Sequence, residues 1–486
     1  MVIDKGFDRT TFCIHINREY GPIRRFLVKI LLKVNKDFYF SFSSDGSCLG
    51  NRCIYIYQPV FLNGRFFADV EKAFKNQFDL VYGNYQEFKL FPIFTLRKKY
   101  LPVWSPMRFW NTNYLGPVIA INSSNLGVNK DLSETELVEV TLKSRVINLS
   151  NIGYSVIGRV YEPNKQLHFE SIKKYLSEFF PKANIYKSSI DQVRISFKSY
   201  APEVISIVVP TRGTKEPIKN QILVENLFES LRNQNYGESK LELVVVYDDD
   251  VDLSYLNKLK ANKKELFVKL VPYTPPFNFS RKSNIGAAHS TGQVLVFLND
   301  DTEFISQDAI LELAGTAMLE DVGAVGAKLF FANQLIQHAG TVVIGGNLGH
   351  AYFKQKDKNG PYGDLTAIHE VSAVTGACLV QRKEIWNYVN GWNEDFDNSY
   401  NDVDYCFKIR KSGYKIIQNN QVELFHFESV TRDATFSPSA KALIERNWQS
   451  YLSDDVFFPD YVNTQKIKQK YRVYLKKIIN RLSLSK

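Results

Sequence analysis

The sequence has few cysteines and lacks any long apolar run. Its five cysteines form no CxxC pair, and an odd number in 486 residues argues against a disulfide framework and for a reducing compartment. The apolar stretches are shorter than the roughly 18 to 20 residues that span a bilayer. The N-terminal residues also lack the basic-then-apolar layout of a signal peptide. We therefore expect a cytoplasmic protein that is neither exported nor integral to a membrane.

The sequence also lacks low-complexity segments and recognised nucleic-acid motifs. Apolar residues make up 44% of the chain and charged residues 23%, so the composition is globular, and the length predicts two or more domains. The net charge of +10 suits nucleic acid, an anionic membrane face or phosphorylated substrates. Because the basic residues are concentrated at the C-terminus, we expect no nucleic-acid partner.

The C-terminal residues 464–486 form a basic tail. Residues 465–486 contain eight Lys or Arg and no acid, with apolar residues at near-helical spacing. One interpretation is an amphipathic helix on anionic lipid, which would place the protein peripherally at the inner face of the cell membrane. The other is a solvated helix packed on the body of the protein.

The pattern of the sequence changes near residue 200, which predicts a domain boundary there. The predicted strands after this point are 205–210, 241–246, 266–271 and 294–298. They are almost continuously apolar and are separated by helical stretches, which predicts a mostly parallel α/β sheet covered on both faces. We expect residues 201–463 to form this domain and residues 1–200 to form a separate module.

Polar residues follow three of these strands, at the edge where ligands bind in such sheets. Thr211 and Arg212 follow the first strand, Asp248 and Asp249 the second, and Asn299-Asp300-Asp301 the fourth. A Mg²⁺ or Mn²⁺ ion that bridges a diphosphate needs one or two carboxylates at a strand end, which makes Asp301 a candidate ligand. The alternative is that these acids cap helices or form polar turns.

Further candidates lie along the predicted domain. Arg281 and Asn284 are at a helix start that can meet phosphate, or that Asn284 merely caps. Trp392 lies among polar residues, which suits a sugar face or core packing. Asp402, at a helix start, can serve as a general base or as a cap. His426 follows an apolar strand and is either a metal ligand or a structural histidine.

Taken in order, several motifs resemble family 2 glycosyltransferases, and among them the bacterial cell-surface polysaccharide and O-antigen transferases. The resemblance covers residues 205–461 and rests on SIVVPTRG, LVVVYDDD, VLVFLNDDTEF, IQHAG, VSAVTGACLV, YNDVDYCFKIR and LFHFES. It implies a GT-A fold, a nucleotide-diphosphate-sugar donor, a divalent metal, and inversion at the anomeric carbon. It also implies a lipid-linked or polymeric glycan as acceptor.

The resemblance carries roles onto individual residues. Asp402 matches the catalytic base, Asp301 the main metal ligand of a DxD motif that here begins with Asn299, and His426 the histidine that completes the metal site. The residues expected to bind the nucleotide sugar are Pro210, Thr211, Arg212, Asp248 or Asp249, Arg281, Asn284 and Asp300. The residues expected to bind the acceptor are Gly376, Trp392 and Asn401.

The first 200 residues resemble a partial glycosyltransferase module that precedes the catalytic one in long members of this branch. The resemblance rests on the segments FDLVY, LPVWSP and NYLG, but no acids follow Tyr82. It implies a degenerate module that serves as a scaffold or an acceptor platform.

Two other functions remain as alternatives. A nucleotidyltransferase would also use an α/β sheet and a metal, but no glycine-rich phosphate loop with Arg or Lys follows the first strand. An inactive scaffold or binding subunit of a polysaccharide assembly complex would not need Asp301, Asp402 and His426 together.

Overall fold

The computed structural model of the chain describes residues 11–16, 39–42, 52–58, 60–89, 95–126, 132–157, 162–215, 222–250, 254–261, 266–274, 276–427, 437–453 and 455–458. The predicted basic tail, residues 464–486, lies outside the described residues. Within the described ranges, no helix is both long enough and apolar enough to cross a membrane.

The chain divides into two compact units. The first unit comprises residues 1–175 and 458–486, and the second comprises residues 176–457. The break falls inside helix α6 (Lys165–Phe179), before the predicted boundary at residues 200/201.

The first unit is built on a mixed eight-stranded sheet with the order β2-β1-β3-β7-β5-β8-β4, to which β6 is added beside β5. The strands are β1 (Thr11–Ile16), β2 (Tyr39–Phe42), β3 (Arg52–Ile56), β4 (Val60–Leu62), β5 (Leu80–Lys89), β6 (Thr95–Lys99), β7 (Val118–Asn122) and β8 (Val146–Ile157). The helices are α2 (Gly64–Lys75), α3 (Pro106–Asn111), α4 (Ser123–Leu126), α5 (Glu134–Lys143) and α6. Helix α2 buries an apolar stripe of Phe66, Phe67 and Val70, and Asn63 caps its start by accepting a hydrogen bond from the Phe66 N–H.

The second unit contains a ten-stranded sheet with the order β13-β12-β11-β14-β21-β16-β22-β15, with β17 beside β16 and β20 beside β22. The strands are β11 (Val204–Thr211), β12 (Lys240–Asp248), β13 (Leu266–Tyr273), β14 (Val294–Leu298), β15 (Thr302–Phe304), β16 (Val322–Phe330), β17 (Ile336–His338), β20 (Ile368–Glu370), β21 (Cys378–Arg382) and β22 (Lys415–His426). The four strands β11 to β14 are parallel, as the sequence predicts, and β21 adds to β14 in the antiparallel direction. The α/β class is confirmed, and the sheet as a whole is mixed.

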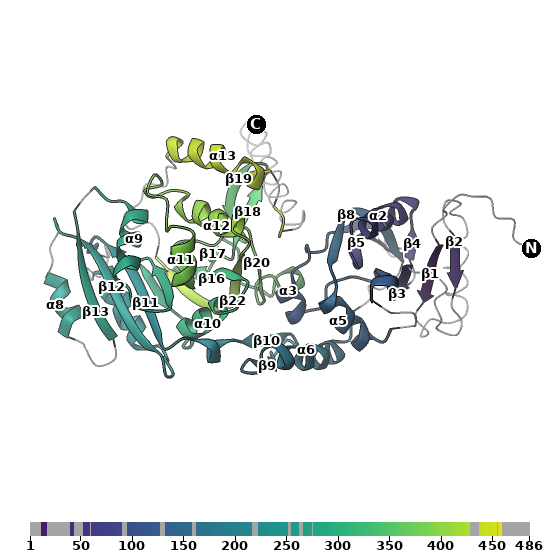
Figure 1. The fold of residues 1–486 in the computed structure, drawn as a ribbon, viewed down its shortest axis with the longest axis horizontal. Helices are drawn as coiled ribbons and strands as arrows, with labels where there is room; N and C mark the ends of the chain where they lie inside the picture. The colour runs from purple at the N-terminus through teal and green to yellow at the C-terminus, as the bar shows by residue number, and fades with distance from the viewer. Residues whose placement is uncertain are drawn as a thin grey trace, which may run out of the picture. The chain divides into compact units, whose positions relative to one another are not determined.

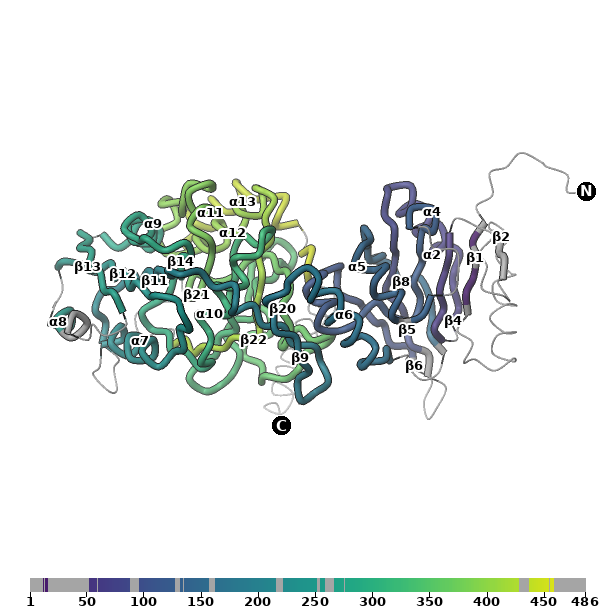
Figure 2. Tube along the Cα trace, turned by 60° about the horizontal axis from the view of Figure 1, so that its bottom comes forward, coloured from purple at the N-terminus to yellow at the C-terminus, as the bar shows by residue number. Residues whose placement is uncertain are grey.

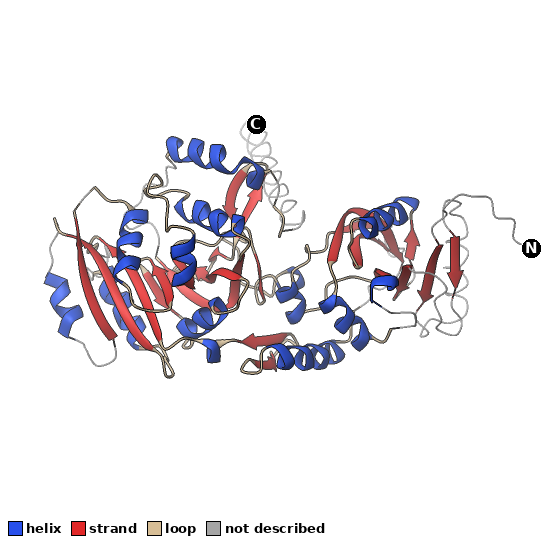
Figure 3. Ribbon diagram, in the orientation of Figure 1, coloured by secondary structure: helices blue, strands red, loops and turns tan. Residues whose placement is uncertain are grey.

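Helices cover this sheet (Figures 1 and 3). They are α7 (Leu223–Arg232), α8 (Ser254–Ala261), α9 (Phe279–His289), α10 (Ala309–Ala317), α11 (Lys383–Tyr388) and α12 (Asn401–Lys411). Helix α13 (Pro438–Leu452) packs on α12, where Trp448 contacts Phe407. Figure 2 shows α9, α11 and α12 along one side of the strands and α7 along the other. Helix α9 packs tightly because Gly286 has no side chain, and a Cβ there would lie 2.3 Å from Val208 Cγ1.

Short elements complete the second unit. They are β9 (Asn184–Lys187), β10 (Val193–Ser196), β18 (Thr341–Ile344), β19 (Asn347–His350), and the 3₁₀ helices η1 (Lys198–Tyr200) and η2 (Pro361–Gly363). The segment before β11 is anchored to α10: Ser196 Oγ donates to Glu312, and the Phe197 N–H donates to Glu312 Oε2 at 3.2 Å. A Cβ on Gly315 would lie 1.9 Å from the Phe197 carbonyl oxygen. The change of sequence pattern near residue 200 therefore marks the start of the large sheet, while the compact unit begins earlier.

Candidate functional site

The candidate site lies at the carboxyl ends of β11, β12 and β14. Parallel pairing sets Thr211 beside Tyr247 and Asp248 beside Tyr273, so these strands end at one edge of the sheet. Across this edge, the Thr211 hydroxyl donates to Asp300 Oδ2 at 2.6 Å. The predicted gathering of polar residues after these strands is therefore observed.

Asp301 and His426 are brought together by the pairing of β15 with β22. Thr302 lies opposite His426 in this antiparallel pair, and the Phe427 N–H donates to the Asp301 carbonyl at 2.9 Å. As a result, His426 Nε2 lies 3.1 Å from Asp301 Oδ1 and 3.1 Å from the side-chain nitrogen of Asn299.

Gln337, at the centre of β17, orients the His426 ring. Its Oε1 is 2.6 Å from His426 Nδ1, while its Nε2 donates to the His426 carbonyl at 3.3 Å. Because an amide oxygen can only accept, the Gln337 contact places the proton on His426 Nδ1, and the lone pair of Nε2 accepts a hydrogen bond from the Asn299 side-chain nitrogen beside Asp301.

Asp402 belongs to the same site through the loop before β21. Its Oδ2 accepts a hydrogen bond from the Gly376 N–H at 3.1 Å, and its Oδ1 accepts one from the Val403 N–H at 2.8 Å. The next residue of the loop, Ala377, accepts a hydrogen bond from the Asn299 N–H at 3.1 Å. Asp402 is thus joined to the Asn299–Asp301 segment through two residues of backbone, and Asn401 lies beside it, nearly buried.

Asp248 is enclosed by two cations. It is fully buried, with Lys282 Nζ 2.6 Å from one oxygen and Arg212 Nε 2.9 Å from the other. Lys282 is itself fully buried, donates to the Thr211 carbonyl at 2.6 Å, and has its pKa lowered mainly by burial. Asp249 differs, since it is exposed and accepts a hydrogen bond from the Thr274 hydroxyl at 2.9 Å.

The pKa of Asp300 is raised to near neutral pH. Burial and then the adjacent charge of Asp301 raise the pKa of Asp300 to about 7, and the hydrogen bond from Thr211 opposes this only in part.

The other predicted binding residues have structural partners. Asn284 accepts a hydrogen bond from the Trp392 N–H at 2.8 Å, and its amide nitrogen donates to the Trp392 carbonyl and to Glu394. Arg281 pairs with Glu394 at 2.7 Å. Trp392 is 2% exposed and stacks on Tyr405, with 4.3 Å between the ring centroids. Pro210 lies within β11. All four residues are predicted from the sequence to contact a ligand. In the structure Arg281, Asn284 and Trp392 hold the loop after α11, and Pro210 is part of the sheet.

The sequence interpretation missed Gln337 and gave Lys282 no partner. Lys282 occurs in a stretch of polar residues at a helix start, where a buried lysine has no distinctive signal. Gln337 lies in the IQHAG segment, but a glutamine in a short strand does not by itself indicate that it orients a histidine. In both cases the missing information is the long-range partner, which spacing along the chain does not reveal.

Residues 251–442 match the model of a family described as a glycosyltransferase-like family. The chain is 31% identical over 271 residues to the uncharacterised protein y4gI of Sinorhizobium fredii, a match that covers 53% of this chain and 29% of that protein. It is 27% identical over 286 residues to the O-antigen biosynthesis protein RfbC of Myxococcus xanthus, covering 58% of this chain and 21% of RfbC. Residues 251–442 of the second unit are thus similar to a glycosyltransferase-like family, and the predicted resemblance is confirmed. The matches span less than a third of either relative.

Solved structures of glycosyltransferases are also similar to this chain at low identity. They include GalNAc-T7 with UDP, GalNAc and Mn²⁺, at 14% identity and a TM-score of 0.41, covering 51% of this chain and 48% of that one. Another is the mannosyltransferase PcManGT from Pyrobaculum calidifontis with GDP-Man and Mn²⁺. Its sequence identity is 18% and its TM-score 0.37, and the match covers 58% of this chain and 76% of that one. A third is S. aureus TarS 1-349 with UDP-GlcNAc. Its sequence identity is 15% and its TM-score 0.37, and the match covers 51% of this chain and 66% of that one. At this level of similarity they assign no role to any residue of this chain.

Proposed function

We propose that the chain is an inverting, metal-dependent GT-A glycosyltransferase. It moves a sugar from a nucleotide-diphosphate sugar to a hydroxyl of a growing cell-surface glycan. The observation that carries the proposal is the convergence of Asp301, His426 and Asp402 on Asn299 and the Gly376–Ala377 backbone. A carboxylate, an imidazole and a separate carboxylate at one edge of an α/β sheet provide both a metal site and a base.

The residues present fit Mn²⁺ or Mg²⁺. Two ligands at right angles around an ion with bonds of about 2.1 Å lie about 3 Å apart, which matches the 3.1 Å between Asp301 Oδ1 and His426 Nε2. The Gln337 contact supplies the outer hydrogen bond that metal-binding histidines usually make. Within the described part of the chain, no group of three His, Cys, Asp or Glu is arranged to hold a metal ion. Phosphate oxygens of the donor and water would complete the shell, and the ion would neutralise the departing diphosphate.

Asp402 is positioned to act as the base. The Gly376 N–H fixes one of its oxygens, which orients the carboxylate on the loop that adjoins the metal ligands. Asp402 takes the proton of an acceptor hydroxyl, whose oxygen then attacks the anomeric carbon on the face opposite the nucleotide. A single displacement of this kind inverts the anomeric configuration and needs no covalent enzyme intermediate.

The donor's phosphate and nucleoside fit the edge formed by Thr211, Arg212, Asp249 and Asp300. Arg212 is half exposed beside this edge and can meet phosphate, whereas Asp248 is committed to Lys282 and Arg212. We therefore assign the nucleoside contact to Asp249, which is exposed at the end of β12. A lipid-linked or polymeric glycan is the proposed acceptor, with the protein at the inner face of the cell membrane through residues 464–486. Residues 1–200 are the proposed scaffold or acceptor platform.

The test combines a donor panel with one substitution. Purified chain is incubated with UDP-, GDP- and dTDP-sugars with and without Mn²⁺, and donor hydrolysis and thermal stabilisation are measured. A donor at 100 times its Kd stabilises the protein by about 2.7 kcal/mol. Asp402→Asn should leave this stabilisation nearly intact and lower turnover by roughly 10²- to 10⁴-fold.

Asp395→Asn is the matched control, because Asp395 is exposed and lies in the loop before the same helix. It should retain full turnover. Turnover that is unchanged in Asp402→Asn would remove Asp402 from the role of base. If no nucleotide sugar stabilises the chain in the presence of Mn²⁺, the chain is an inactive binding subunit and the proposal is wrong.

A further inference from the structure

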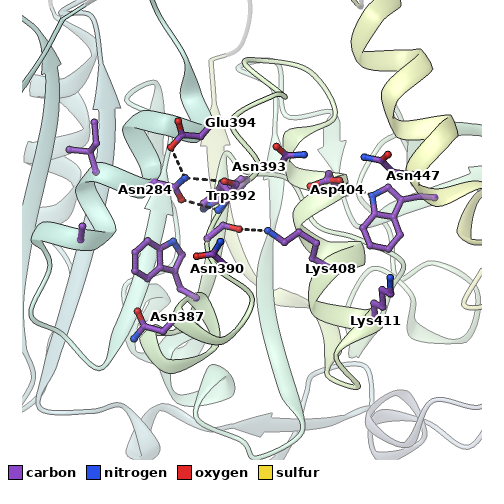
Figure 4. Close-up of a pocket in the computed structure, with 15 residues that line it drawn as sticks. Asn284, Asn387, Asn390, Trp392, Asn393, Glu394, Asp404, Lys408, Lys411 and Asn447 are labelled. Carbon is purple, nitrogen blue, oxygen red and sulfur yellow. Dashed lines mark hydrogen bonds between the residues drawn. The ribbon is translucent and has the colours of Figure 1, made fainter.

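A polar cavity of about 1060 Å³ lies in the second unit, away from the Asp301 and His426 pair. Its walls come from α9, α11, the loop after α11, α12 and α13 (Figure 4). Five asparagines, three tryptophans, two lysines, one aspartate and one glutamate line it. Its volume is at the upper end of the roughly 300 to 1,000 Å³ typical of ligand pockets, which leaves room for more than one sugar ring.

The cavity and the transfer site lie on different sides of α12. Asp404 lines the cavity, and it follows Asp402 by two positions. Two positions on a helix turn the side chain by about 200°, so Asp404 is directed away from the loop that Asp402 contacts. Figure 4 shows Asp404, Lys411 and Asn447 on one side of the cavity and Asn387 and Asn390 on the other.

Asp404 has unused hydrogen-bonding capacity. The carboxylate is 2% exposed, and Oδ1 accepts a hydrogen bond from Trp448 Nε1 at 2.7 Å. Oδ2 has no hydrogen-bond partner among the described residues. A buried acceptor without a partner is costly, and a hydroxyl donor from a ligand would remove that cost. Burial also raises the pKa of Asp404, in keeping with its low hydration.

The other lining groups favour a neutral, hydroxyl-rich ligand. The side chains of Asn387 and Asn447 are exposed and form no hydrogen bond to the described part of the chain. Each amide offers two donors and one acceptor, as sugar hydroxyls require. Lys408 is occupied by the Gly391 carbonyl at 2.6 Å, Lys411 lies over the Trp448 ring, and Glu394 is paired with Arg281. Of the three tryptophans, the half-buried Trp386 supplies aromatic surface against which the apolar face of a sugar ring packs.

We propose that this cavity binds a neutral saccharide, namely a non-reacting segment of the glycan acceptor. The assignment of the saccharide to the acceptor rests on the proposed function, whereas the binding itself does not. Bound there, the glycan would be held on α12 while another of its sugars reaches Asp402 at the start of the same helix.

Tryptophan fluorescence provides the assay, because three of the five tryptophans of the chain line the cavity. The probes are maltotriose, galactotriose and a rhamnose trisaccharide as neutral ligands, and trigalacturonic acid as an anionic one. Each is titrated into the full chain and into Asp402→Asn. A neutral trisaccharide should shift the emission of both proteins with the same affinity.

The double variant Asn387→Ala/Asn447→Ala should weaken this binding by about tenfold, as expected for the loss of two hydrogen bonds of modest strength. Gln449→Ala is the matched control, since Gln449 is exposed on α13 but does not line the cavity. It should bind as the unchanged chain does. Equal binding by the double variant, a response to trigalacturonic acid alone, or no response to any probe would overturn the inference. If the chain binds a neutral trisaccharide but turns over no nucleotide sugar, the proposed function is wrong and the saccharide site is still supported.

Discussion

Lys282→Met tests whether the buried cation beside Asp248 stabilises the carboxyl ends of β11 and β12. Lys282 Nζ lies 2.6 Å from both Asp248 Oδ1 and the Thr211 carbonyl oxygen. The side chains of Lys282 and Asp248 are fully buried. Breaking a buried pair by removing one partner costs about 3 to 5 kcal/mol, because a charge is left buried and uncompensated. Arg212, at 2.9 Å from the other Asp248 oxygen, offsets part of this, so we expect about 3 kcal/mol.

Hydrogen exchange read by mass spectrometry is the appropriate assay, because a chain with two units has no single unfolding equilibrium. A loss of about 3 kcal/mol should speed exchange in the β11 and β12 peptides by on the order of 100-fold. Peptides of β3 and β7, in the first unit, serve as the internal control and should exchange at an unchanged rate.

The double variant Asp248→Asn/Lys282→Met separates the ion pair from simple packing. It removes both buried charges, and Arg212, being half exposed, can turn to solvent. We expect the double variant to be clearly more stable than the sum of the two single variants would predict. Additive losses would show that the two charges do not depend on each other, and the electrostatic reasoning would fail.

Three further predictions concern other parts of the chain. Burial lowers the pKa of His168 from 6.5 to about 4, so the unfolded chain takes up the proton first and the first unit loses stability as pH falls from 6.5 to about 4; His168→Phe should remove this pH dependence of exchange in α3 and α6. Gly315→Ala should lower the temperature at which the second unit melts, because overpacking against Phe197 typically costs about 1 to 3 kcal/mol. A rise would mean that helix propensity outweighs the clash. Gln337→Leu should weaken Mn²⁺ binding by about 10- to 100-fold, measured by Mn²⁺-dependent thermal stabilisation, since His426 loses its orienting partner; unchanged binding would show that Gln337 does not set the ring.

The parallel half of the second sheet could be predicted from the sequence because its strands are local, apolar and separated by helices. Strands β11 to β14 fall close to the predicted ranges, and their polar ends meet at one edge as expected. The other half, in which β16 and β22 are parallel and the remaining pairs are antiparallel, could not be predicted in this way. Its pairings join distant segments, such as β15 with β22, and no periodicity within either strand specifies the partner.

The same distinction applies to individual residues of the site. Asp301, Asp402 and His426 could be named because each follows or begins a regular element and matches a motif. Asn284 also matches a motif, but its side chain already forms hydrogen bonds to Trp392 and Glu394, which lie more than 100 residues further along the chain. A motif therefore predicts which element carries a side chain, whereas the hydrogen-bond partners of that side chain determine whether its polar atoms are available to a ligand.

The three carboxylates Asp248, Asp300 and Asp301 at the ends of β12 and β14 differ in what surrounds each of them. Asp248 is neutralised by Lys282 and Arg212, so it attracts no further positive charge. Asp300, with its pKa raised to about 7, relieves part of its repulsion with Asp301 by binding a proton near neutrality. Asp301 faces His426, whose Nδ1 proton is held by Gln337 and whose Nε2 therefore presents a lone pair. Under the proposed function, the position between Asp301 Oδ1 and His426 Nε2 is where a divalent metal would bind, in place of the contact that Asn299 now makes to Nε2.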